Sequence, residues 1–123
     1  MGFFSKKETP SIPWINLTSE EELDAAIKQS FDKPVALFKH STRCSISSMA
    51  KSRLERSWDL SEQVDIYYLD LISYRPVSNK IASVLAVQHE SPQVILLKDG
   101  KAVYHTSHSD ISVEGLKEEL GVG

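Results

Sequence analysis

The strongest constraint on the fold is a set of strand-like segments that alternate with helix-like segments and end in a hairpin. Asp99-Gly100 joins two apolar segments, residues 93–98 and 101–105, and an Asp-Gly pair in this setting is a strong signal for a two-residue turn between antiparallel strands. The earlier strands are separated by helices, and strands connected in this way pair in parallel through right-handed crossovers. The sequence therefore predicts an α/β domain with a mixed sheet that helices cover on both faces.

Three further segments have strand character. Residues 35–39 form an almost continuous apolar run, which is typical of a strand buried on both faces. Residues 64–71 are rich in β-branched and aromatic side chains, and residues 14–17 can form a short first strand. Together with the hairpin, these segments predict the order β-α-β-α-β-α-β-β-α, with about five strands and about four helices.

Helix signals lie between the strands. Thr18 with Glu21, or Ser19 with Glu22, forms a capping box at a helix start. Apolar residues then recur at helical spacing in four segments. They are Leu23, Ala26, Ile27 and Phe31; Ile46, Met49, Ala50, Leu54 and Trp58; Val77, Ile81, Val84 and Leu85; and Val113, Leu116 and Leu120. We expect Met49 and Trp58 to be core residues.

Length and composition indicate one globular domain. The chain has 123 residues, of which 41% are hydrophobic and 25% charged, and its net charge is −3. A slightly negative net charge does not indicate a nucleic-acid-binding protein, because such proteins have an excess of basic residues. We expect residues 1–13, which include Pro10 and Pro13, to form a flexible N-terminal arm, and residues 14–123 to form a single domain.

We expect a cytoplasmic monomer without a membrane partner. The N-terminus lacks the charged region and long apolar core of a signal peptide. Lys6 stands where myristoylation would require Ser or Thr, and no apolar run approaches the ~20 residues of a membrane span. A single cysteine cannot form an internal disulfide and fits a reducing compartment.

That cysteine, Cys44, is the first candidate for chemistry. It lies where the strand at residues 35–39 gives way to a helix. A cysteine on the first turn of a helix faces unpaired backbone N–H groups and the positive end of the helix dipole. Both favour the thiolate, which is the nucleophilic form. A free cysteine is also often a small buried core residue, and the local sequence leaves both interpretations open.

The chain resembles a known family. The order of its elements is similar to that of the thioredoxin superfamily from about residue 14 to residue 120, with Cys44 at the position of the active cysteine. Its local sequence resembles the active site of the YtxJ-type monothiol bacilliredoxins. The matching segments are Lys39-His40-Ser41-Thr42-Arg43-Cys44-Ser45-Ile46-Ser47, Trp14-Ile15-Asn16-Leu17-Thr18, Tyr67-Tyr68-Leu69-Asp70 and His89-Glu90-Ser91-Pro92-Gln93. The family usually reads Thr-Cys-Pro-Ile-Ser, whereas Arg43 precedes and Ser45 follows the cysteine here.

The resemblance implies an activity. A monothiol bacilliredoxin removes bacillithiol from S-bacillithiolated cytosolic proteins through a mixed disulfide, here Cys44-S-bacillithiol. Ser47 stands where a dithiol enzyme has its second cysteine, so an outside thiol must resolve that intermediate. Bacillithiol is then a co-substrate, and no bound cofactor is required. The thioredoxin fold also implies a cis-proline loop at Ser91-Pro92, beside the cysteine.

Five residues near Cys44 are expected to stabilise the thiolate or position the substrate. They are Ser47, Ser45, Arg43, Thr42 and His40. Ser47 could donate a hydrogen bond to the thiolate, and Arg43 could pair with it or with the malate carboxylates of bacillithiol. A protonated His40 would favour the thiolate. Three of the five have an alternative interpretation: helix-start polarity for Ser47, a solvated loop side chain for Arg43 and a structural hydrogen bond for His40.

The same sequence is also compatible with other functions. His105-x-x-His108-x-Asp110 is not predicted to bind a metal, because residues three apart on a strand point to opposite faces. The main alternative is a non-catalytic interaction module with Cys44 as a regulatory thiol. A glutaredoxin that carries an iron–sulfur cluster would have Cys-Gly-Phe-Ser, which is missing. Peroxidase chemistry would proceed through a sulfenic acid at Cys44.

Overall fold

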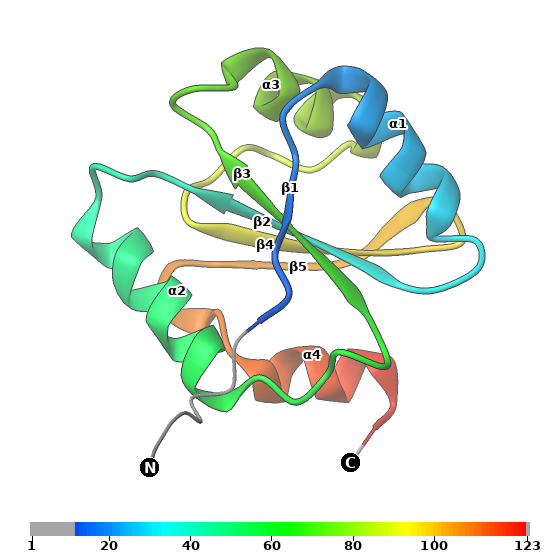
Figure 1. Ribbon diagram of the computed structural model, residues 1–123, viewed down its shortest axis with the longest axis vertical. Coiled ribbons are helices and arrows are strands. Elements are labelled where there is room, and N and C mark those ends of the chain that lie inside the picture. Colours follow the sequence, from blue (N-terminus) through cyan, green and yellow to red (C-terminus); the bar gives the residue numbers. More distant parts are fainter. Residues whose placement is uncertain (1–11, 123) are drawn as a thin grey trace, which may run out of the picture.

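The computed structural model describes residues 12–122 and contains a five-stranded sheet with helices on both sides (Figure 1). The elements, in chain order, are β1 (Ile15–Asn16), α1 (Glu20–Gln29), β2 (Val35–His40), α2 (Ser45–Ser57), β3 (Asp65–Asp70), α3 (Arg75–Leu85), β4 (Gln93–Lys98), β5 (Lys101–Ser107), the 3₁₀ helix η1 (His108–Asp110) and α4 (Val113–Leu120). This order confirms the predicted succession of strands and long helices. The short η1 had no counterpart in the sequence prediction.

The sheet is mixed, as predicted. Its strand order is β1-β3-β2-β4-β5, so β2 is central. Strand β3 runs parallel to both β1 and β2, whereas β4 is antiparallel to β2 and β5 is antiparallel to β4. The carboxyl ends of β2 and β3 therefore lie at the same edge of the sheet as the amino end of β4. Lys39 pairs with Gln93 at this edge.

Helices cover the two faces in pairs: α1 with α3 on one side, and α2 with α4 on the other (Figure 1). Each pair encloses its own hydrophobic core. Successive residues of β2 supply both cores, with Ala36 and Phe38 on the α2 side and Val35 and Leu37 on the α1 side. The apolar run at residues 35–39 is thus a strand buried on both faces, as its composition predicted.

The start of α1 shows the predicted capping interaction. The Ser19 hydroxyl accepts a hydrogen bond from the Glu22 N–H at 3.1 Å. The Glu22 carboxylate in turn accepts from the Thr18 N–H at 2.7 Å and from the Thr18 hydroxyl at 3.0 Å. These bonds hold the pKa of Glu22 below its usual value, first through the Thr18 backbone N–H and then through its hydroxyl.

The prediction that Met49 lies in the core was wrong, and three other apolar residues of the helical stripes are exposed with it. Phe31, Ile46, Met49 and Val84 are between 51% and 62% exposed. In α2 the buried face is formed by Ser47, Ala50 and Leu54, which turns Ile46 and Met49 toward solvent. The apolar spacing was misleading because a polar residue, Ser47, is part of the buried face of α2. Trp58 is buried at 5% exposure, as predicted.

The N-terminal part of the chain bears on the predicted domain boundary. Residues 1–11 of the expected arm lie outside the described residues. Ile12 is buried at 6% exposure and packs in the core beneath α2 and α4. Ile12, which the sequence placed in the arm at residues 1–13, is therefore part of the packed domain. Within residues 12–122, no helix combines the length and the apolar character needed to cross a membrane.

The predicted β4–β5 hairpin yields a stability test at Gly100. Asp99 and Gly100 have φ values of 54° and 78°, both positive as a type I′ turn requires. A Cβ on Gly100 would also meet the Phe31 ring at 2.5 Å. Gly100→Ala should therefore lower the free energy of unfolding in urea by about 2–3 kcal/mol. Gly121→Ala is the matched control, because Gly121 has a φ of 73° with open space around it. Equal losses in the two variants would show that the Phe31 contact is unimportant.

Candidate active site

Cys44 lies at the carboxyl end of β2, as the N-cap residue of α2. Its backbone is extended, with φ −114° and ψ 121°, and its carbonyl accepts the Ser48 N–H at 3.1 Å. The side chain is partly exposed and makes no capping hydrogen bond. The sulfur therefore stands beside the first N–H groups of the helix, a position that favours an anion, and it is accessible to a reactant.

Ser47 is fully buried and binds His40. Its Oγ lies 2.7 Å from Nδ1 of His40 and accepts a hydrogen bond from the Ser41 N–H at 3.1 Å. This geometry corrects one prediction, because within residues 12–122 the Ser47 hydroxyl is engaged with His40 and Ser41 and makes no hydrogen bond to Cys44. Ser47 instead ties the first turn of α2 to the end of β2.

His40 does not supply the positive charge that the sequence interpretation considered. It is 5% exposed and packs against the rings of Phe38 and Tyr68, with centroids 5.7 and 5.5 Å away. Burial, followed by the nearby Lys51 ammonium, lowers the pKa of His40 below its usual value. The imidazole is therefore neutral near pH 7, and its role is the structural hydrogen bond to Ser47.

Thr42, Arg43 and Ser45 are exposed around the cysteine. Thr42 and Arg43 form the turn between β2 and α2, and Ser45 is the first residue of α2. Their side chains make no hydrogen bond or ion pair within the part of the chain that the structure describes. Contact with a bound substrate remains a prediction for all three.

A second loop reaches the same edge of the sheet. The Ser91-Pro92 peptide bond is cis, as the thioredoxin-like order implied. Pro92 is buried, and its carbonyl accepts a hydrogen bond from the His108 N–H at 3.1 Å. Since Pro92 immediately precedes β4, and β4 is paired with β2, this loop lies beside the strand end that carries Cys44. A substrate that approaches Cys44 can therefore also meet the backbone of Ser91.

Exposed apolar side chains flank the cysteine, and one of them, Met49, was predicted to be a core residue. Ile46 and Met49 of α2 are 51% and 62% exposed. Ile72 and Tyr74, in the segment between β3 and α3, are 36% and 37% exposed. The spacing of Ser47, Ala50 and Leu54 could have indicated that Ile46 and Met49 face outward. These four residues provide apolar surface at the edge where β2 and β3 end.

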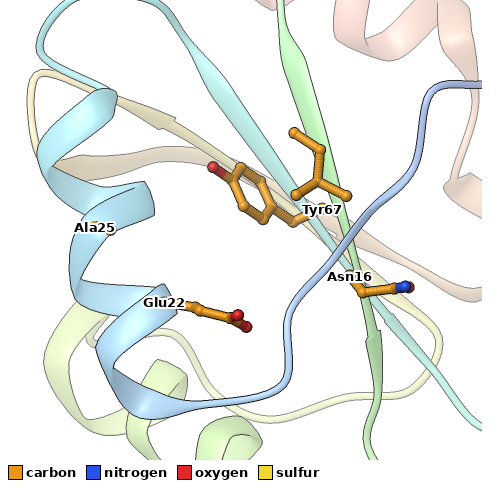
Figure 2. Close-up of a pocket in the computed structure, with 5 residues that line it drawn as sticks. Asn16, Glu22, Ala25 and Tyr67 are labelled. Carbon is orange, nitrogen blue, oxygen red and sulfur yellow. The ribbon is translucent and has the colours of Figure 1, made fainter.

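Two hollows lie on opposite sides of β1. The first, of about 310 Å³, is lined by Trp14, Asn16, Lys51 and Tyr68 on the α2 side. The second, of about 200 Å³, lies between α1 and the β1–β3 edge, where Glu22 and the Tyr67 ring point into the space (Figure 2). Tyr67 belongs to the core under α1 and α3, so the second hollow is on the face away from α2. Within residues 12–122, no group of three or more His, Cys, Asp or Glu residues is arranged to hold a metal ion.

Comparisons with known proteins give the same fold and a family. The family model described as monothiol bacilliredoxin BrxC matches residues 15–116. A solved structure described as a proposed oxidoreductase with a thioredoxin fold is 33% identical, with a TM-score of 0.75, over 85% of this chain and 90% of that one. Thioredoxin from Malassezia sympodialis is 15% identical, with a TM-score of 0.68, over 94% and 95% of the two chains. Oxidized mitochondrial thioredoxin 3 from Saccharomyces cerevisiae is 19% identical, with a TM-score of 0.66, over 88% and 93%. The two thioredoxins show the fold alone.

Proposed function

The chain belongs to the monothiol bacilliredoxin family, and from this premise we propose that it removes bacillithiol from S-bacillithiolated cytoplasmic proteins at Cys44. The family and the thioredoxin fold support a thiol–disulfide redox function. One observation carries the finer proposal: a single thiol, free of capping hydrogen bonds, stands at a helix start in a chain without a second cysteine. Such a thiol can accept a small thiol and must then give it to another molecule.

The proposed first step transfers bacillithiol to Cys44. The Cys44 thiolate attacks the bacillithiol sulfur of the protein mixed disulfide and forms a new S–S bond. The old S–S bond breaks, and the substrate protein leaves as a thiolate that takes a proton from water. One disulfide is lost and one is gained, so the step involves no net oxidation. The N-terminal N–H groups of α2 stabilise the Cys44 thiolate before the attack.

The proposed second step regenerates the thiol. The Ser47 hydroxyl is not a thiol and cannot displace bacillithiol, so a second bacillithiol thiolate or a partner redoxin attacks the bacillithiol sulfur on Cys44. With bacillithiol the products are bacillithiol disulfide and the free Cys44 thiolate. Bacillithiol is thus a co-substrate, and neither a bound cofactor nor a second copy of the chain is required. The exposed residues Ile46, Met49, Ile72 and Tyr74 support a contact with substrate proteins.

Mass spectrometry after reaction with a bacillithiolated protein tests the proposal. We expect one bacillithiol on Cys44 of the wild type, release of the substrate thiol, and removal of the adduct by added bacillithiol. Cys44→Ala should show no adduct and no release. If the wild type remains unmodified while an alkylating agent still labels Cys44 slowly, the bacilliredoxin activity is refuted. The non-catalytic interaction module, with Cys44 as a regulatory thiol, is then the better description.

A further inference from the structure

Lys39 is a charged residue in the interior of the protein. It is the fifth residue of β2, five positions before Cys44, and its relative exposure is 0%. The alternation of side chains along β2 places it on the same face as Val35 and Leu37, in the direction of α1 and α3. Isolated ammonium groups are strongly disfavoured in such surroundings. A lysine at this position therefore requires a reason other than packing.

The Lys39 ammonium reaches the loop that carries the cis proline. Its Nζ lies 2.7 Å from Nδ1 of His89, and His89 is two residues before Ser91. The other bonds of this loop lead to β4, β5 and η1. The Gln93 amide donates to the Gln88 carbonyl at 3.0 Å, the Ser107 hydroxyl donates to the Glu90 carboxylate at 2.6 Å, and the His108 N–H donates to the Pro92 carbonyl at 3.1 Å. Within residues 12–122, Lys39–His89 is the side-chain hydrogen bond that joins the loop to β2.

We propose that the Lys39–His89 hydrogen bond locks the loop at residues 88–92 against β2 and so positions the cis-proline segment beside Cys44 for exchange with protein disulfides. The inference rests on the proposed exchange activity and assigns Lys39 as a positioning residue for it. The bond connects β2, the strand that leads to Cys44, with the loop that meets the substrate backbone. A protein substrate must contact Cys44 and the loop at residues 88–92 at the same time, so it needs the two held in a fixed relative position. A small disulfide needs only the sulfur of Cys44.

The charges around this bond give it a pH dependence. Burial lowers the pKa of Lys39 to about 8, against the attraction of Glu90. Burial, then Lys39 and Arg75, lower the pKa of His89, while Glu90 raises it. At neutral pH a charged Lys39 therefore donates to a neutral His89. In acid, protonated His89 can no longer accept this bond, and two positive charges then face each other, so the lock should open.

A positioning role and a purely structural role of Lys39 predict different stabilities for the variant Lys39→Met. Lys39→Met keeps a long, unbranched side chain and removes a buried charge. Replacing a buried ionic group by an apolar one of similar volume is often neutral or stabilising. A lysine retained for stability should make this variant less stable. A lysine retained to position the loop should make it equally or more stable but slower in exchange.

The test compares Lys39→Met with the wild type and with Lys98→Met, which removes an exposed lysine at the far end of β4. We expect about a tenfold loss in the rate of exchange with a bacillithiolated protein. This is less than the ~100-fold cost of a 1 Å misplacement of the reacting groups, because the loop keeps its other hydrogen bonds. Exchange with a small bacillithiol mixed disulfide, and the melting temperature, should not fall. Lys98→Met should match the wild type. Unchanged protein exchange, or a loss in proportion with both substrates, would overturn the proposal.

Two further readouts separate failure of the lock from failure of the proposed function. The first readout is the rate of exchange with the protein substrate divided by the rate with the small disulfide. Both reactions need the Cys44 thiolate, so this ratio does not depend on how much of Cys44 is ionised. In the wild type this ratio should fall in acid, and His89→Gln, whose amide oxygen also accepts a hydrogen bond, should abolish that fall while preserving the neutral ratio. Hydrogen–deuterium exchange of the backbone N–H groups of residues 88–91 should be faster in Lys39→Met whether or not bacillithiol is the substrate. Equal protection in both proteins would refute the lock, whereas an inactive wild type would refute only the activity.

Discussion

Ser47→Cys is expected to convert the monothiol protein into a dithiol exchanger. Cys44 and Ser47 have the spacing of a Cys-x-x-Cys pair, with Cys44 at the N-cap of α2 and Ser47 in its first turn. A thiol at position 47 would lie next to a mixed disulfide on Cys44. Intramolecular attack has a very high effective concentration when the groups are well oriented. The lifetime of the Cys44 mixed disulfide should therefore fall by at least about 100-fold relative to resolution by millimolar thiol.

The expected products distinguish the two proteins. Wild type treated with a small disulfide should retain one thiol adduct until more thiol is added. Ser47→Cys should release that thiol at once and form an internal disulfide between Cys44 and the new cysteine, seen in the intact mass as a loss of two hydrogens. Ser52→Cys, on an exposed position of the same helix, should keep the adduct on Cys44 until more thiol is added, as the wild type does, although its new thiol can also take up an adduct. A folded Ser47→Cys protein whose adduct persists would show that the two side chains are not aligned for attack.

The variant also separates the two roles available to Ser47. In the structure its hydroxyl binds His40 at 2.7 Å and the Ser41 N–H at 3.1 Å. A cysteine side chain makes weaker hydrogen bonds, so the link between α2 and the end of β2 should loosen. We infer that serine at this position combines a firm tie to His40 with the absence of a resolving thiol, and the second property makes the protein depend on an outside thiol.

The fold was predictable because local signals and long-range connections agreed. The apolar run at residues 35–39 identified the central strand, and Asp99-Gly100 identified the hairpin that follows the parallel strands. Parallel strands with helical crossovers leave few arrangements. The position of Cys44 at the end of β2 followed from the same order. These features depend on residues close together in sequence, where patterns are informative.

The surroundings of Cys44 were less predictable because they depend on contacts between distant segments. Lys39 and His89 are 50 positions apart, and no local pattern indicates that they meet. The neutral state of His40 depends on its burial and on the nearby charge of Lys51, which lies in α2. Met49 was assigned to the core because apolar spacing cannot distinguish a core stripe from an exposed one when a buried serine occupies the inner face. The features that the sequence did not reveal are therefore buried polar side chains, such as Lys39, and exposed apolar ones, such as Met49.

The buried ammonium of Lys39 should make the protein more stable in mild alkali. The unfolded chain keeps the ordinary lysine pKa of 10.5, whereas the folded protein has a pKa of about 8 for Lys39. Between these values the unfolded state binds a proton that the folded state has lost, so the free energy of unfolding rises with pH. Below pH 8 both states are protonated, and the cost of burying the charge is fully present. The gain from pH 7 to about 9.5 should be about 2 kcal/mol.

Urea unfolding at several pH values measures this gain. Burial raises the pKa of Tyr67 and Tyr68, so above about pH 10 the unfolded state ionises first and stability falls again. The comparison should therefore stop near pH 9.5. Lys39→Met removes the Lys39 contribution and leaves Cys44 and the tyrosines in place, so the stability of the wild type relative to this variant should rise by about 2 kcal/mol from neutral pH to pH 9.5. A constant difference would mean that Lys39 has an ordinary pKa in the folded protein, and the ammonium would then have to be better solvated than its complete burial indicates.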